Sequence, residues 1–148
     1  MKIYVACSSD ERDRARYWIE KLKAAGFEIT SKWLDIIETK QAGVANPRGD
    51  DVNATRFDAA TQDVQDVRAA HVLWALLPKV PDAYGSAACV PPFARGVYYE
   101  AGVADALEKP RFFSGDFQQS VFPSRGAEFK EDIDAFTAIV AYARKERM

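Results

Sequence analysis

The feature that most constrains the fold of this chain is a run of apolar residues in its middle. Residues 71–77 read HVLWALL, and after His71 the run contains no polar side chain. A strand that is apolar on both faces must be covered on both faces, and in parallel sheets helices supply that cover. The run therefore predicts a central parallel strand with a layer of helices on each side.

Two strand-like segments flank a helical pattern at the start of the chain. Residues 2–6 (KIYVA) are apolar after Lys2 and are soon followed by two serines, and residues 27–33 (FEITSKW) alternate in polarity. Between them, residues 10–25 place apolar side chains at helical spacing, and Gly26 is suited to close that helix. The order strand, helix, strand predicts a βαβ unit over the first 33 residues.

The rest of the chain continues the alternation. Pro110 ends a helical segment ahead of RFFSG, which predicts a fourth strand, and SVF at residues 120–122 predicts a short fifth strand. The other expected segments are loops over 34–55 and 78–96, helices over 56–70 and 97–108, and an amphipathic helix over 130–146 with Ile133, Phe136, Val140 and Ala143 on one face.

These elements predict an α/β fold. We expect a three-layer sandwich around a mostly parallel, flavodoxin- or Rossmann-like sheet of 4-5 strands in the order 2-1-3-4-5. We also expect it to form a single domain over residues 1–148.

Composition and short motifs disfavour several classes of function. The net charge is −2 and no basic block is present, which disfavours nucleic acid as a partner. No apolar segment approaches the roughly 18 residues of a membrane span, and the charged N-terminal region is unlike a signal peptide. Cys7, Cys89 and the single histidine lack metal-ligand spacing, and GxGxxG and P-loop motifs are absent, so we expect no metal and no cofactor. Two unpaired cysteines suit a reducing cytoplasm.

The predicted strand order locates a ligand site. In a doubly wound sheet, ligands bind beyond the carboxyl ends of the strands where the strand order reverses, here between the first and third strands. Residues 7–10 (CSSD) follow the first strand, and Glu100, within GVYYEAGVADALEKP, follows the loop after the third. Ser9 or Asp10 could cap the next helix, and Ser8 and Ser9 could also bind a phosphate at its N-terminus.

Glu100 allows two interpretations. It could be an acid in the first turn of a helix, where it complements the helix dipole, or a nucleophile beside a bound ligand. Gly96 permits a positive φ or the close approach of a ligand just before the helix. Ala101, Gly102 and Ala104 predict that this helix packs closely on the sheet.

Three segments in the same order carry a family resemblance. IYVACSS, DVQDVRAAHVLWAL and GVYYEAGVADALEKP together resemble the nucleoside 2-deoxyribosyltransferase superfamily, over residues 2–112. That superfamily includes transferases that exchange bases between deoxyribosides and deoxynucleoside 5'-monophosphate N-glycosidases that hydrolyse the same bond. The resemblance implies that Glu100 attacks the anomeric carbon of the sugar, that Asp63 handles the proton of the leaving base, and that Tyr4 orients the glutamate. It also implies a homodimer or a larger homo-oligomer, because a neighbouring subunit often completes the pocket in these proteins.

The chain departs from the transferase pattern at two places. Transferases carry an aspartate six residues before the catalytic glutamate, where this chain has Ala94; the monophosphate N-glycosidases also lack it, so Ala94 favours hydrolysis slightly over base exchange. Arg95 and Gly96 replace a hydrophobe–glycine pair, and Arg95 either meets a phosphate or points to solvent. The expected substrate-binding positions are Ser8, Ser9, Arg95, Gly96 and Tyr98.

Structural roles remain open for the two partners of Glu100. Asp63 lies on a helix with Asp58 and Asp66, a pattern that is equally typical of a solvated acidic face. Tyr4 lies on a central strand, where a tyrosine often serves only as part of the core. Each could therefore be structural rather than catalytic.

Three further residues lie near the expected site or the core. His71 is interpreted as a structural histidine, and Trp33 could stack on a base but is also suited to the core. Cys7 lies near the expected site without an evident base, so no thiol nucleophile is proposed. The sequence predicts a cytoplasmic enzyme that cleaves or transfers at the N-glycosidic bond of a (deoxy)nucleoside or its 5'-monophosphate; the alternative is a non-catalytic nucleotide-binding or sensing module on the same fold.

Overall fold

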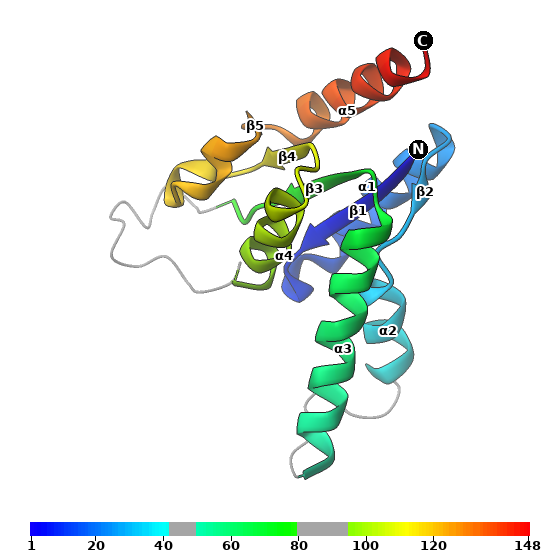
Figure 1. Ribbon diagram of the computed structural model, residues 1–148, viewed down its shortest axis with the longest axis vertical. Helices are drawn as coiled ribbons and strands as arrows, with labels where there is room; N and C mark the ends of the chain where they lie inside the picture. The colour runs from blue at the N-terminus through cyan, green and yellow to red at the C-terminus, as the bar shows by residue number, and fades with distance from the viewer. Residues whose placement is uncertain (42–49, 80–94) are drawn as a thin grey trace.

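The computed structural model describes residues 1–41, 50–79 and 95–148, and its centre is a five-stranded sheet in which all neighbouring strands are parallel. The strands lie in the order β2-β1-β3-β4-β5 (Figure 1), so the predicted order is confirmed. The strands are β1 (Lys2–Cys7), β2 (Glu28–Ile29), β3 (Val72–Leu76), β4 (Arg111–Ser114) and β5 (Ala127–Phe129). The helices are α1 (Arg12–Ala24), α2 (Trp33–Gln41), α3 (Asp50–Ala69), α4 (Arg95–Ala106) and α5 (Asp132–Arg147), with 3-10 turns η1 (Ser9–Glu11), η4 (Phe117–Gln119) and η5 (Phe122–Arg125).

Helices cover both faces of the sheet, which confirms the predicted three layers. On one face, Trp18 of α1 packs against Phe136 of α5 and against Trp74 of β3, with ring centroids 5.6 and 5.4 Å apart. On the other face, α3 and α4 lie side by side and both contact β1 (Figure 1). The layer that contains α3 and α4 positions the candidate site.

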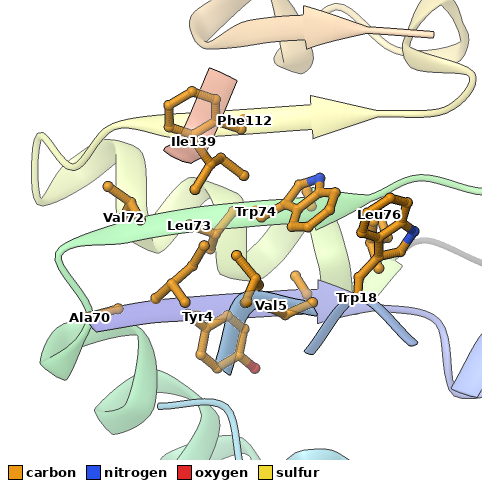
Figure 2. Packing of buried hydrophobic residues seen from close by; sticks show 14 of the residues in the cluster. Tyr4, Val5, Trp18, Ala70, Val72, Leu73, Trp74, Leu76, Phe112 and Ile139 are labelled. Carbon is orange, nitrogen blue, oxygen red and sulfur yellow. The ribbon is translucent and has the colours of Figure 1, made fainter. Parts of the chain in front are cut away.

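The apolar run in the middle of the chain forms the centre of the core. All five residues of β3 have 0% exposure, as expected for a strand covered on both faces. Figure 2 shows Leu73, Trp74 and Leu76 of this strand above Tyr4 and Val5 of β1. Tyr4 pairs with Leu73, and Val5 pairs with Trp74, so each pair lies on the same face of the sheet. Tyr4 therefore points into the layer of α3 and α4.

Two predictions for the segment after the first helix are wrong. The second strand is much shorter than residues 27–33, and α2 begins at Trp33, inside the predicted strand, and occupies part of the predicted loop 34–55. The reason is a tertiary contact: the Trp33 indole Nε1 donates to the carbonyl of Val5 at 2.8 Å, which holds the start of α2 against β1. The third helix also begins at Asp50 rather than at residue 56.

The fifth strand exists but lies elsewhere. It spans Ala127–Phe129 and pairs with β4, whereas residues 120–122 lead into the turn η5. Gly126 makes this pairing possible, because a Cβ at this position would lie 2.6 Å from the carbonyl oxygen of Arg111 and 2.7 Å from the Phe113 ring. The strand is short and mostly exposed, so we attribute its position to that close approach rather than to its own three residues.

The predicted apolar face of the last helix is confirmed at Phe136, Val140 and Ala143 but is wrong at Ile133. Its buried residues are Asp132, Ala135, Ile139 and Ala143, while Ile133 is 55% exposed. Asp132 turns inward because it is bound by side chains of α1 and β4. Within the described parts of the chain, no helix has the length and apolar character needed to cross a membrane.

Candidate active site

Glu100 meets Tyr4 on the α3–α4 side of the sheet. The phenol oxygen of Tyr4, a fully buried residue of strand β1, donates a 2.7 Å hydrogen bond to Oε1 of Glu100. Glu100 lies in the second turn of α4, because that helix begins at Arg95, two residues earlier than predicted. The interpretation of Glu100 as a first-turn acid is therefore wrong, and the helix dipole does not explain its presence. Val97, Ala101 and Ala104 face the sheet, which places Glu100 on the flank of α4 nearer β1.

Burial dominates the electrostatics of Glu100. Withdrawal from water raises its pKa to about 8; the Tyr4 hydrogen bond acts in the opposite direction, and the nearby charge of Asp63 adds to the rise. The same surroundings raise the pKa of the Tyr4 phenol well above its ordinary range, through burial and then the charge of Glu100. Tyr4 therefore stays protonated and serves as a hydrogen-bond donor.

Asp63 lies on α3 within electrostatic reach of both groups. Burial, reinforced by the charge of Asp66, raises its pKa to about 6. The interpretation as a solvated acidic face is wrong for Asp66, which is 3% exposed and accepts bonds from the Lys32 backbone N–H at 3.1 Å and from Gln62 at 2.8 Å. The side chain of Asp58 lies outside what the structure describes.

Asp66 is a residue that the sequence reasoning assigned no role. Its three-residue spacing from Asp63 places both carboxyls on neighbouring positions of one helix face. The spacing could have suggested that Asp66 belongs near the site. Its burial could not be predicted, because it depends on the contact with Lys32 from the segment between β2 and α2.

Ser8 and Ser9 follow β1 at its carboxyl end, on the predicted edge of the sheet. The N-cap of α1 falls on Glu11, which makes no side-chain cap bond, so the predicted cap of this helix by Ser9 or Asp10 is wrong. Burial raises the pKa of the Cys7 thiol to about 12, which agrees with the expectation that it is not a nucleophile.

Gly96 and Tyr98 lie in the first turns of α4. The positive-φ glycines among the described residues are Gly26 and Gly115, so the positive φ considered for Gly96 is not found. A Cβ at Gly96 would meet no atom within 4 Å. Tyr98 lies on a different flank of α4 from Glu100, with its ring centroid 6.4 Å from that of Phe122. The side chain of Arg95 and all of Ala94 lie outside the described residues, so the predictions for them are not tested.

Two other residues take structural positions. Trp33 is 8% exposed and bound to the backbone of β1, which agrees with core packing. His71 accepts a hydrogen bond from the Lys2 backbone N–H at its Nδ1, 3.0 Å away, which ties β1 to the start of β3. Across residues 1–41, 50–79 and 95–148, no group of three or more His, Cys, Asp and Glu side chains could hold a metal ion.

Comparisons with known proteins identify a solved structure with a similar fold. No protein-family model matches the chain, and no curated protein matches its sequence. The solved structure of the CMP N-glycosidase BcmB from Clostridium botulinum is similar, with a TM-score of 0.51 and 13% sequence identity over 94% of this chain and 98% of that one. The chain therefore has the α/β fold of that N-glycosidase over nearly its whole length, which agrees with the resemblance at the level of the superfamily fold.

Proposed function

We propose that this chain is an enzyme that cleaves the N-glycosidic bond of a nucleoside 5'-monophosphate or nucleoside. The observation that carries the proposal is the hydrogen bond from Tyr4 to Glu100, which joins a strand and a helix 96 positions apart in the chain. A buried phenol fixes the direction of a carboxyl group, and a second carboxyl group, Asp63, lies within electrostatic reach. The shared fold with an enzyme named as a CMP N-glycosidase supports the same class of reaction.

The two carboxyl groups hold the number of protons that this reaction needs. With pKa values of about 6 for Asp63 and about 8 for Glu100, the pair carries one proton near pH 7. Cleavage of an N-glycosidic bond needs one ionised carboxylate at the sugar and one acid at the leaving base. In the free chain the proton rests mainly on Glu100, so it must pass to Asp63 before Glu100 attacks.

The reaction then proceeds in two steps, transfer of the sugar to Glu100 and release of the sugar by water. In the first, Glu100 forms a bond to C1' while the bond from C1' to the base nitrogen breaks, and the proton of Asp63 goes to that nitrogen. In the second, a water oxygen bonds to C1' as the ester to Glu100 breaks, and the water proton returns to Asp63. Tyr4 keeps Glu100 oriented through both steps.

Further residues are proposed to hold the substrate. Ser8 and Ser9, at the carboxyl end of β1 and ahead of α1, suit the sugar 5' end or its phosphate. Gly96 of α4, with Arg95 ahead of it, completes the proposed substrate contacts, whereas Tyr98 lies on a different flank of α4 from Glu100 and is no longer proposed as one. Ala94 remains the reason to place hydrolysis ahead of base exchange.

The direct test is release of a free base. The purified chain is incubated with CMP, dCMP and the other common nucleosides and monophosphates, and the products are separated by chromatography. We expect free base from at least one of them, and a loss of at least about 10³-fold in Glu100→Gln. The matched control is Glu20→Gln, an exposed glutamate on α1, which should keep full activity. A second base added as acceptor yields a new nucleoside only if transfer operates.

The pH dependence provides a second test. Because the singly protonated pair is the active form, kcat/KM should follow a bell whose limbs lie near the two pKa values, about 6 and about 8. A profile that rises steadily to pH 10 would contradict the assignment of one shared proton to Asp63 and Glu100, even if base release is confirmed.

One observation favours a second candidate, a non-catalytic nucleotide-binding module. The raised pKa of Glu100 leaves it mostly neutral at pH 7, a state suited to donating a hydrogen bond to a ligand. This candidate predicts saturable binding of CMP without base release, and a Glu100→Gln variant that binds with only slightly changed affinity.

We further propose that residues 1–148 form a single domain that works in the cytoplasm as a homodimer or a larger homo-oligomer. Light scattering coupled to size-exclusion chromatography measures the assembly directly; a monomer at micromolar concentration would contradict it.

A further inference from the structure

A cavity lies on the flank of α4 that faces away from Glu100. It has a volume of about 250 Å³ and lies between α4, β4 and η5. Its walls are aromatic: Tyr98 from α4, Phe113 from β4 and Phe122 from η5. Tyr98 and Phe122 face each other with ring centroids 6.4 Å apart and an interplanar angle of 51°.

Gly102 keeps this space open. It lies four positions after Tyr98 and three before Asp105, so the three residues follow one stripe of the helix. A Cβ at Gly102 would meet nothing within 4 Å, and the residue is exposed. The prediction that Gly102 helps α4 to pack on the sheet is therefore wrong, and its missing side chain instead leaves room beside the aromatic walls.

Arginine side chains give the cavity a positive character. Arg111 and Arg125 both pair with Asp105, at 2.6 and 3.2 Å, so these three lining residues carry a net charge of +1 (two cations and one anion). The guanidinium of Arg111 also donates to the backbone carbonyls of Lys109 and Arg125. Its Nε is buried and has no hydrogen-bond partner among the described residues. Because this Nε is closed to water, the arginine that a ligand in the cavity meets most readily is Arg125, the more exposed of the two.

We propose that this cavity is a second binding site, separate from Glu100, for a small planar aromatic anion such as an aromatic carboxylate. Its volume exceeds the roughly 150 Å³ that holds benzene in an engineered apolar cavity, and it is smaller than the usual site for a drug-sized ligand. A single ring with one charged substituent fits between these limits. The ring contacts the aromatic walls, and the anionic group meets the arginines.

The site does not depend on the proposed reaction. Tyr98, Gly102 and Asp105 lie on one stripe of α4, while Glu100 turns toward β1. A ligand can therefore occupy the cavity whether or not Glu100 is catalytic, and the two sites can be tested separately.

The test uses benzoate as the probe, with binding measured by calorimetry and by NMR shifts of residues on α4 and η5. Two matched compounds separate the contributions: benzamide keeps the ring without the charge, and cyclohexanecarboxylate keeps the charge without the flat ring. We expect benzoate to bind about tenfold more tightly than either, because each loses one of the two contacts.

The decisive variant is Gly102→Leu, which places a side chain in the open space. We expect it to fold, since the added Cβ meets no atom, and to weaken benzoate binding at least tenfold. Gly102→Ala is the matched control, because it adds one carbon and leaves most of the volume; its benzoate affinity should change less than threefold. Arg125→Gln removes the more exposed arginine and should weaken benzoate but not benzamide. Glu100→Gln should leave benzoate binding unchanged.

Three results would overturn the proposal. The first is equal benzoate binding by the wild-type chain and Gly102→Leu. The second is no saturable binding by the folded wild-type chain. The third is a wild-type dimer that Gly102→Leu dissociates, since the cavity would then hold a side chain of a second copy.

Discussion

Two carboxylates are withdrawn from water on opposite faces of the sheet, and their surroundings differ. Asp132, on the α1–α5 side, accepts four hydrogen bonds: two from Arg14 at 2.6 and 2.8 Å, one from Trp18 at 3.0 Å and one from Ser114 at 2.7 Å. Glu100, on the α3–α4 side, receives one from Tyr4, and its charged neighbour Asp63 is also an acid. The same functional group thus has an excess of donors in one place and a shortage in the other.

The pKa values of the two groups move in opposite directions. Burial opposes ionisation of Asp132, but its four bonds and the charge of Arg14 outweigh it and lower the pKa. For Glu100 burial outweighs the single Tyr4 bond, and the pKa rises to about 8. Burial alone does not make a carboxyl group reactive; what separates the two sites is whether the fold supplies enough donors to satisfy the charge.

The largest expected effect comes from breaking the satisfied site. Asp132→Ala leaves the Arg14 guanidinium without its main partner, and we expect a loss of about 3–5 kcal/mol in the free energy of unfolding. Urea denaturation measures it. Asp134→Ala, in the same turn of α5 but exposed, should stay within about 0.5 kcal/mol of wild type. Equal effects of the two substitutions would show that the bonds to Asp132 contribute no stability.

Substitution of Glu100 should stabilise the fold, whereas substitution of Asp132 should destabilise it. Because the folded pKa of Glu100 lies above the ordinary value of 4.5, its contribution to stability is fully present below pH 4.5 and is lost as the pH rises toward 8. Glu100→Gln removes that loss, so we expect it to stabilise the fold by about 2 kcal/mol at pH 9 while abolishing activity. Denaturation of both proteins at pH 5 and pH 9 measures the difference; a destabilised variant at pH 9 would mean that the charge is satisfied.

Asp132 provides the matched pH comparison. Its folded pKa is lowered, so its contribution is present above the ordinary value of about 3.8 and is lost as the pH falls through the folded value. The two sites together predict that Glu100→Gln alters stability above about pH 4.5 and not below it, leaving acid unfolding near that of wild type.

A smaller effect is expected from removing the one donor at Glu100. In Tyr4→Phe the ionised form of Glu100 loses its hydrogen bond, so its pKa should rise by about one unit. The alkaline limb of the kcat/KM profile then moves above pH 8, and the plateau falls about tenfold because less of the pair holds its proton on Asp63. Tyr17→Phe, an exposed tyrosine on α1, is the control. An unchanged limb would remove Tyr4 from its orienting role.

The sequence predicted the elements whose own residues are apolar enough to require burial. The run at β3 implied a strand covered on both faces, and the order of elements then led to the sheet topology. The strand β5 was misplaced and the helix α2 was missed because both depend on contacts distant in the chain: the close approach at Gly126 and the bond from Trp33 to β1. The inward turn of Asp132 was missed for the same reason, since polar residues are expected on the outer face of a terminal helix.

The sequence selected the residues of the candidate site, but it did not determine the direction of their pKa shifts. Topology and the family resemblance selected Tyr4, Asp63 and Glu100. Hydrogen bonding and burial act on Glu100 in opposite directions, and only the three-dimensional surroundings decide which is larger. Tyr98 belongs to the same motif as Glu100, yet the turn of the helix places its ring in the cavity on the other flank.

The central claim is that Glu100 attacks the sugar, and an acid quench during turnover tests it most directly. Intact-mass and peptide mass spectrometry of the quenched protein should find a sugar or sugar-phosphate adduct on the peptide that carries Glu100, absent in Glu100→Gln. Base release that continues at the wild-type rate in Glu100→Gln, or an adduct on another residue, would contradict the account.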